Sequence, residues 1–211
     1  EWIYQLLSPD KSIIKSPGSY NSQIGVPLSV WGMAKHHQLG VFEAGISKTD
    51  EMEQLQSIIQ PTIGILTNLG SAHDEGFPNR ITKLQEKLKL FSNCECIIYP
   101  LDANIPNNIL QQYTCKKISW TFNKDADLRF DVRAVSPHAT EVDCTFKQQS
   151  FSLEMPFADT ASLENVATCV ALLLHLKVPE NIIAQRVESL LPIQMRLELK
   201  KGIGQSMLID D

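Results

Sequence analysis

The chain has 211 residues, of which 43% are hydrophobic and 20% are charged, and its net charge is −5 at pH 7. This composition is typical of a soluble globular protein, and acidity without any lysine- or arginine-rich run argues against nucleic acid as a partner. No apolar run reaches the roughly 18–20 residues of a membrane-spanning helix, and five cysteines, an odd number without zinc-site spacing, favour reduced thiols in a cytoplasmic protein.

Helical and strand patterns alternate through the first hundred residues. Helices are predicted at residues 1–7, 26–37, 49–60 and 79–91, and short strands at residues 11–16, 38–45, 61–70 and 95–100. In the third helix Thr49 is the expected N-cap. One face of that helix carries Met52, Leu55, Ile58 and Ile59. Strands separated by helices at this rhythm predict an α/β fold with a mainly parallel sheet and helices on both faces.

After Trp120 the pattern changes to an alternation with a period of two residues. Three antiparallel strands are predicted at residues 128–136, 140–148 and 149–156. Helical patterns then return at residues 161–176 and 179–191, and a last strand is predicted at residues 206–211. We therefore expect one domain, in which the antiparallel sub-sheet of about residues 128–156 is an insertion or a flap on the sheet edge.

Polar loops follow three of the predicted parallel strands, at residues 16–22, 43–45 and 68–77. Because ligands bind at the carboxyl ends of such strands, we expect these loops to lie together. Glu43 follows an apolar strand, where a carboxylate needs a salt bridge, a helix to cap or a metal ion. Together with His73 it would suit Mg²⁺ or Mn²⁺ held with substrate phosphates, although a histidine in a turn is more often a simple hydrogen-bonding residue.

Lys87 is the third candidate, on the predicted helix at residues 79–91. The inner face of that helix is marked by Ile81, Leu84, Leu88 and Phe91. Lys87 lies beside this stripe, and spacing alone favours an apolar stem with a solvated ammonium.

Seven segments resemble motifs of the Mur ligase family, in the order in which the family carries them. They are SPGSYNSQIGVPLSV (16–30), FEAGISKTDEM (42–52), PTIGILTNLGSAHDEGF (61–77), EKLKLF (86–91), SLENVATCVAL (162–172), MRLE (195–198) and LIDD (208–211). The first is similar to the TxGNxNNxIGxPLT segment of the members that add D-Ala-D-Ala to UDP-N-acetylmuramoyl-tripeptide. The resemblance implies that residues 1–211 are one ATP-binding central domain with a P-loop NTPase-like fold.

The resemblance also implies an ATP-dependent amide ligase of peptidoglycan precursor synthesis. Such ligases transfer the γ-phosphate of ATP to a carboxylate, and an amine then attacks the acyl phosphate. In that scheme Glu43 and His73 match ligands of two Mg²⁺ ions. Lys87 matches a lysine that CO₂ converts to a carbamate at the metal site, which would replace the solvated ammonium that spacing favours.

Further residues acquire expected roles from the same resemblance. Asn165 matches a residue near the adenine, Arg196 one near the phosphates, and Asp211 one at the ribose. Ser16, Ser19 and Asn21 are expected to face the nucleotide phosphates or the end of the tripeptide. The alternative for their segment is a rigid turn that positions the following helix.

The chain departs from the family pattern in several places. It contains no GxxGKT phosphate-binding loop and no counterpart of the UDP-binding or C-terminal domains, so we expect no ligase activity from these residues alone, only from a longer parent. Ser19 stands where asparagine is usual, and Glu86 where alanine is usual. Glu164 and Thr168 replace a histidine and an asparagine of the HNxxN motif.

The same residues are compatible with other functions. The closest alternatives are another Mur ligase and a folylpolyglutamate synthase-like ligase. A non-catalytic nucleotide-binding scaffold is the alternative from a different class. The sequence also resembles versions of the ligase that are fused to an alanine racemase.

Overall fold

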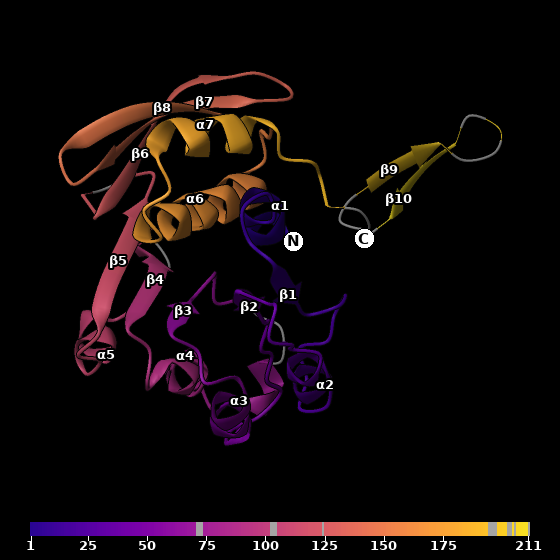
Figure 1. The fold of residues 1–211 in the computed structure, drawn as a ribbon, viewed down its shortest axis with the longest axis vertical. Coiled ribbons are helices and arrows are strands. Elements are labelled where there is room, and N and C mark those ends of the chain that lie inside the picture. The colour runs from indigo at the N-terminus through magenta and orange to yellow at the C-terminus, as the bar shows by residue number, and fades with distance from the viewer. Residues whose placement is uncertain are drawn as a thin grey trace.

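The computed structural model describes residues 1–70, 74–101, 105–123, 125–193, 198–201, 204 and 206–210 (Figure 1). The helices are α1 (Trp2–Leu7), α2 (Gly25–Trp31), α3 (Glu51–Ile59), α4 (Arg80–Leu88), α5 (Asn107–Gln111), α6 (Thr160–His175) and α7 (Glu180–Glu188). Two short 3₁₀ helices are η1 (Asp74–Gly76) and η2 (Lys89–Phe91). Within these ranges no helix is both long and apolar enough to span a bilayer.

The strands fall into three sheets. They are β1 (Ile13–Lys15), β2 (Leu39–Val41), β3 (Ile63–Ile65), β4 (Cys96–Pro100), β5 (Lys116–Thr121), β6 (Leu128–Val135), β7 (Thr140–Phe146), β8 (Gln149–Met155), β9 (Glu198–Lys201) and β10 (Met207–Asp210). The main sheet has the order β3-β4-β5-β6-β7-β8, parallel from β3 to β6 and antiparallel from β6 to β8. A parallel pair, β1 and β2, and an antiparallel hairpin, β9 and β10, complete the set.

The predicted antiparallel strands are confirmed, and they extend the main sheet at its edge. Trp120 of β5 pairs in parallel register with Leu128 of β6, so β6 to β8 continue the sheet that β3 to β5 begin. The predicted last strand pairs with β9 instead of joining the parallel strands. In Figure 1 this hairpin lies to one side of the body.

Helices cover both faces of the main sheet, as the alternating pattern predicts. Cys96 and Ile98 of β4 belong to a large apolar cluster shared with α1, α6 and α7. Ile97, between them, belongs to a second cluster with Leu84 and Leu88 of α4. Because successive side chains of a strand point to opposite faces, the two clusters lie on opposite sides of the sheet.

Helix α2 is shorter than predicted. It ends at Trp31 with Gly32 as its C-cap, and residues 33–38 form turns. Glycine is a poor helix former, which accounts for the stop. Leu28 and Trp31 are exposed, whereas Val26 and Ser29 face the interior.

The predicted start of α3 and inner face of α4 are partly wrong. Asp50, not Thr49, is the N-cap residue of α3, with a left-handed φ of 66° and no capping bond from its side chain. On α4, Ile81 is 53% exposed, while Lys83 and Glu86 are only 2% and 3% exposed. The buried face of α4 therefore contains two charged side chains that were not among the residues predicted to mark it.

The five cysteines all lie within the described residues, and all are free. Cys94, Cys96, Cys144 and Cys169 are buried, and Cys115 is partly exposed. No disulfide joins them, and the reduced state of the thiols stays a prediction.

Candidate active site

Glu43 is held by the polar loop that follows β1. Asn21 Nδ2 donates a hydrogen bond to Glu43 Oε1 at 2.9 Å, and Ser16 Oγ accepts one from the Glu43 backbone N–H at 3.1 Å. Backbone bonds join the same loops, from Gly45 N–H to the Asn21 carbonyl at 2.7 Å and from Ser16 N–H to the Val41 carbonyl at 3.0 Å. The first two predicted loops therefore meet at one edge, and the Glu43 side chain is exposed there.

The loop after β1 is also a tight turn. This agrees with the alternative prediction of a rigid turn that positions the following helix. A Cβ on Gly25 would lie 2.7 Å from Tyr20 Cα, and Gly18 has a φ of 51°, so both positions favour glycine. Ser22 Oγ accepts a hydrogen bond from the Gly25 N–H at 3.2 Å, at the start of α2. Ser19 is exposed, and its carbonyl accepts from the Asn21 N–H at 2.7 Å. The segment thus both turns the chain and braces Glu43.

The loop after β3 reaches the same region. A Cβ on Gly76 would lie 1.8 Å from the Ser47 carbonyl oxygen, so η1 and the loop between β2 and α3 approach too closely for any side chain at this position. The buried Lys83 Nζ donates a hydrogen bond to the Gly70 carbonyl at 2.7 Å, which connects the segment after β3 to α4. His73 lies outside the described residues, and its predicted role as a metal ligand stays a prediction.

Lys87 is half-buried on α4. Burial lowers the pKa of Lys87, the neighbouring Lys83 ammonium lowers it further, and the Glu43 carboxylate partly opposes both. A lowered pKa enlarges the fraction of neutral amine, which is the nucleophilic form. Because the Glu43 carboxylate acts on the pKa of Lys87, the two side chains interact electrostatically.

Lys83 is a residue that the motifs did not point to. It precedes Lys87 by four residues, and residues at this spacing share one helix face. That spacing was visible in the sequence, but the burial of Lys83 was not, because it depends on the loop after β3 folding over α4.

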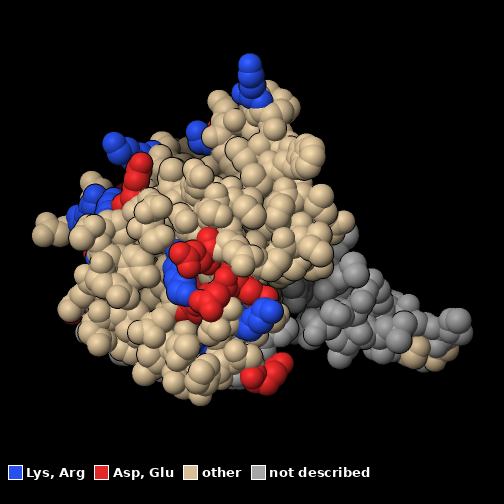
Figure 2. All heavy atoms as spheres, turned by 90° about the horizontal axis from the view of Figure 1, so that it is seen from below, with Lys and Arg blue, Asp and Glu red and all other residues tan. Residues whose placement is uncertain are grey.

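The donors near Glu43 and Lys87 suit a hard cation shared with a phosphate ligand. Mg²⁺ is usually bound by one or two carboxylates together with waters and substrate phosphates. Glu43 supplies one carboxylate, and a carbamate on Lys87 would supply another. Among the residues that the structure places, no three His, Cys, Asp or Glu side chains gather into a closed metal cage. In Figure 2, charged side chains cluster on the face seen from below, the side where α2, α3 and α4 lie in Figure 1.

The predicted nucleotide contacts stay predictions. Asn165 is exposed in the first half of α6. Arg196 and Asp211 lie outside the described residues, so their roles stay predictions.

Comparison with known proteins identifies the family. Residues 1–173 match the Mur ligase middle domain. The UDP-N-acetylmuramoyl-tripeptide--D-alanyl-D-alanine ligase of Bacillus subtilis is 23% identical over 214 residues, which cover 100% of this chain and 46% of that protein.

Two solved structures are similar over the whole chain. The crystal structure of MurF from Acinetobacter baumannii has a TM-score of 0.87 at 22% identity, covering 100% of this chain and 47% of its own. MurF ligase from Thermotoga maritima in complex with ADP has a TM-score of 0.81 at 21% identity, covering 100% of this chain and 49% of its own. The chain spans about half the length of the relatives it matches. It belongs to the Mur ligase family.

Proposed function

We propose that these residues form the nucleotide- and metal-binding part of an ATP-dependent amide ligase that adds D-Ala-D-Ala to UDP-N-acetylmuramoyl-tripeptide. The observation that carries the proposal is that Asn21 and Ser16 hold Glu43 at the edge where two polar loops meet, and that Glu43 acts electrostatically on the half-buried Lys87. Relatives named for this reaction match the chain from end to end, which supports the choice of substrates.

Lys87 acts first, on CO₂. The neutral amine nitrogen forms a bond to the carbon of CO₂ and releases one proton to solvent, which leaves a carbamate anion. Burial beside Lys83 favours the neutral amine that this step needs. An unmodified ammonium would repel a cation here, whereas the carbamate attracts one.

Glu43, the Lys87 carbamate and His73 would then hold Mg²⁺ together with the ATP phosphates. When bound, the metal neutralises the charge of the phosphoryl group during its transfer to the tripeptide carboxylate. Ser16 and Asn21 contribute by fixing Glu43 from both its backbone and its side chain. This role of Ser16 and Asn21 differs from the contact with phosphates or tripeptide that the motif implied. Ser19 does not share it and could still make such a contact.

The nucleotide lies against residues from other segments in this proposal. Asn165 contacts the adenine, Arg196 the phosphates and Asp211 the ribose. Because residues 1–211 contain no GxxGKT loop, the cradle for the β- and γ-phosphates comes from another part of a longer protein. Residues 1–211 alone are therefore expected to be inactive.

The test is phosphate release by the full-length protein with ATP, Mg²⁺, D-Ala-D-Ala and UDP-N-acetylmuramoyl-tripeptide. Lys87→Ala is expected to lower the rate by about 100-fold or more, and removal of bicarbonate should lower the wild-type rate. Lys11→Ala, a change of an exposed lysine, is the matched control and should leave the rate unchanged. No release with any amino-acid acceptor would favour a nucleotide-binding scaffold, and release that needs glutamate and folate instead would favour a folylpolyglutamate synthase-like ligase.

A further inference from the structure

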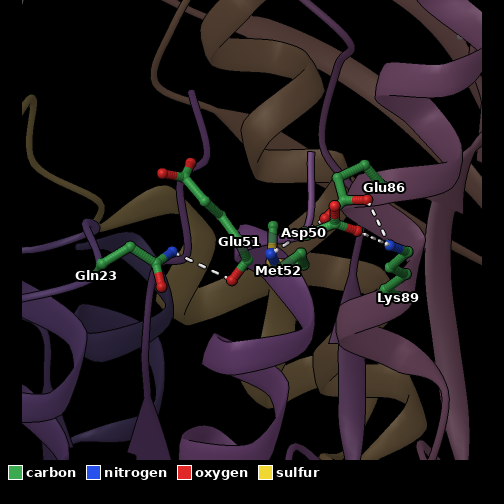
Figure 3. A network of polar contacts seen from close by, with 6 residues as sticks. All are labelled: Gln23, Asp50, Glu51, Met52, Glu86 and Lys89. Atoms are coloured by element: carbon green, nitrogen blue, oxygen red, sulfur yellow. Dashed lines mark hydrogen bonds and ion pairs between the residues drawn. The ribbon is translucent and has the colours of Figure 1, made fainter. Parts of the chain in front are cut away.

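Glu86 directly precedes Lys87 on α4, and its carboxylate is buried. Only 3% of the residue is exposed, and such a charge is costly to bury unless it is paired and hydrogen-bonded. Both oxygens have partners: Oε1 accepts from the Met52 backbone N–H at 3.3 Å, and Oε2 accepts from Lys89 Nζ at 2.7 Å (Figure 3). Lys89 Nζ also pairs with Asp50 Oδ1 at 3.3 Å.

These contacts join α4 to the first turn of α3. Met52 is the second residue of α3, where backbone N–H groups have no partner within the helix. The side chain of the N-cap residue Asp50 does not fill this role. Glu86 fills it from a different helix, and its negative charge lies at the positive end of the α3 dipole.

The start of α3 is in turn tied to the loop that carries Glu43. The Glu51 carboxylate accepts from the Ser47 N–H at 2.7 Å and from the Lys48 N–H at 3.2 Å. Gln23 Nε2 donates to the Glu51 carbonyl at 3.2 Å, which adds the segment just before α2 (Figure 3). Ser47 lies only four residues after Glu43, so the chain of contacts runs from α4 to the Glu43 loop.

We infer that Glu86 is a positioning residue, which holds Lys87 on α4 at a fixed separation from Glu43. The inference rests on the proposed function, in which these two side chains share a cation. Few buried apolar side chains stabilise the region between α4 and the Glu43 loop. The polar contacts of Glu86 therefore contribute strongly to the distance between Lys87 and Glu43. The residues of this small core are Val26, Ile46, Met52, Leu55 and Phe77.

The brace predicts a specific effect of changing Glu86. In Glu86→Gln, an amide oxygen can still accept from the Met52 N–H, but the charge opposite Lys89 is lost. Glu86→Ala removes both contacts and leaves α3 without its partner. Because small displacements of paired groups weaken their joint action strongly, we expect Glu86→Ala to weaken cation binding by about tenfold and Glu86→Gln by about threefold.

The experiment measures Mn²⁺ binding by electron paramagnetic resonance on the full-length protein with ATP, together with the Mg²⁺ concentration that half-saturates phosphate release. In each Glu86 variant, the Kd for Mn²⁺ and the half-saturating Mg²⁺ concentration should rise by the same factor. The rate at saturating Mg²⁺ should change less than about twofold. Val187→Ala is the control for stability, because it opens a cavity in the large apolar cluster and should lower Tm without changing either metal readout.

Two outcomes overturn the inference in distinguishable ways. Suppose that the wild type shows bicarbonate-dependent activity and that both Glu86 variants bind Mn²⁺ as tightly as it does. Glu86 then stabilises the fold only and does not position Lys87. If the wild type neither binds Mn²⁺ with ATP nor releases phosphate, the proposed function fails as well. Should Glu86→Ala fail to fold, Glu86→Gln alone decides the question.

Discussion

The body built on β3 to β8, α6 and α7 and the region around β1, β2, α2 and α3 are stabilised in different ways. In the body, both faces of β4 are covered by apolar side chains, and one large cluster extends from α1 to α7. Around Glu43 the apolar core is small. A hydrogen bond donated by Asn21 and hydrogen bonds accepted by Ser16 and Glu86 hold the loops and helices in place. We therefore expect stability and metal binding to depend on different parts of the molecule, and variants should separate them.

The largest effect on stability is expected in the body. Phe130 of β6 is fully buried, and Phe130→Ala should lower the free energy of unfolding by about 3–5 kcal/mol, because it removes a large apolar side chain and leaves a cavity. Urea denaturation measures the loss. The folded fraction should still bind Mn²⁺ normally, and a parallel loss of metal affinity would contradict the separation of the two regions.

A smaller loss is expected where the loops meet. Gly76→Ala places a Cβ against the Ser47 carbonyl, so the backbone must shift, at a cost of about 1–3 kcal/mol. Gly70→Ala is the matched control, because nothing lies within 4 Å of the added Cβ. Here metal affinity should fall together with stability. Equal behaviour of the two glycine variants would show that the close approach does not constrain the site.

Asn21→Ala should change stability by only about 0.5–1.5 kcal/mol, the usual net value of one hydrogen bond. It removes the donor to Glu43 Oε1, so the carboxylate loses its fixed orientation. We expect a higher Mg²⁺ concentration for half-saturation with little change in Tm. Ser152→Ala, which removes a hydrogen bond to Asp143 on the exposed part of the β7–β8 pair, should leave the Mg²⁺ requirement unchanged.

The smallest effect is a pH dependence at Lys87. In CO₂-free buffer its pKa lies below the unfolded value, mainly because burial disfavours the ammonium. Between these two pKa values the unfolded state binds more protons, so wild-type stability rises with pH in that window. The excess in free energy of unfolding of Lys87→Met over wild type should therefore be largest at neutral pH. It should shrink as the pH approaches the unfolded pKa of about 10.4. Denaturation at two pH values measures it, and an advantage that grows with pH would refute the assignment.

The sequence was most informative where order is local. Alternating apolar segments predicted the parallel strands and the antiparallel strands at residues 128–156. Polar loops at strand ends predicted that the loops carrying Ser16, Asn21 and Glu43 lie together, but not the contacts between these residues. The parallel pairing of Trp120 with Leu128 joins the two parts of the sheet, and no periodicity signals such a pairing. Helix α5, at five residues, is too short for a periodic pattern to show.

Long-range polar contacts account for the other errors. Thr49 is a good cap by residue type, yet the first turn of α3 takes its partner from Glu86, which lies more than thirty residues away in sequence. Lys83 and Glu86 were not predicted to be buried, and their burial depends on contacts with Gly70, Met52 and Lys89. Their closeness to Lys87 follows from the sequence, whereas their burial beside it follows only from the packing of α3 and the loop after β3 against α4.

The most direct test is a ¹³C NMR spectrum of the full-length protein supplied with ¹³C-bicarbonate, Mg²⁺ and ATP. A carbamate on Lys87 predicts a carbonyl signal in the wild type that is absent in Lys87→Met and weaker in Glu43→Gln, because Glu43 would share the cation with the carbamate. A wild type without that signal, or a signal that persists in Lys87→Met, would contradict the central claim that Lys87 becomes an anionic partner of Glu43.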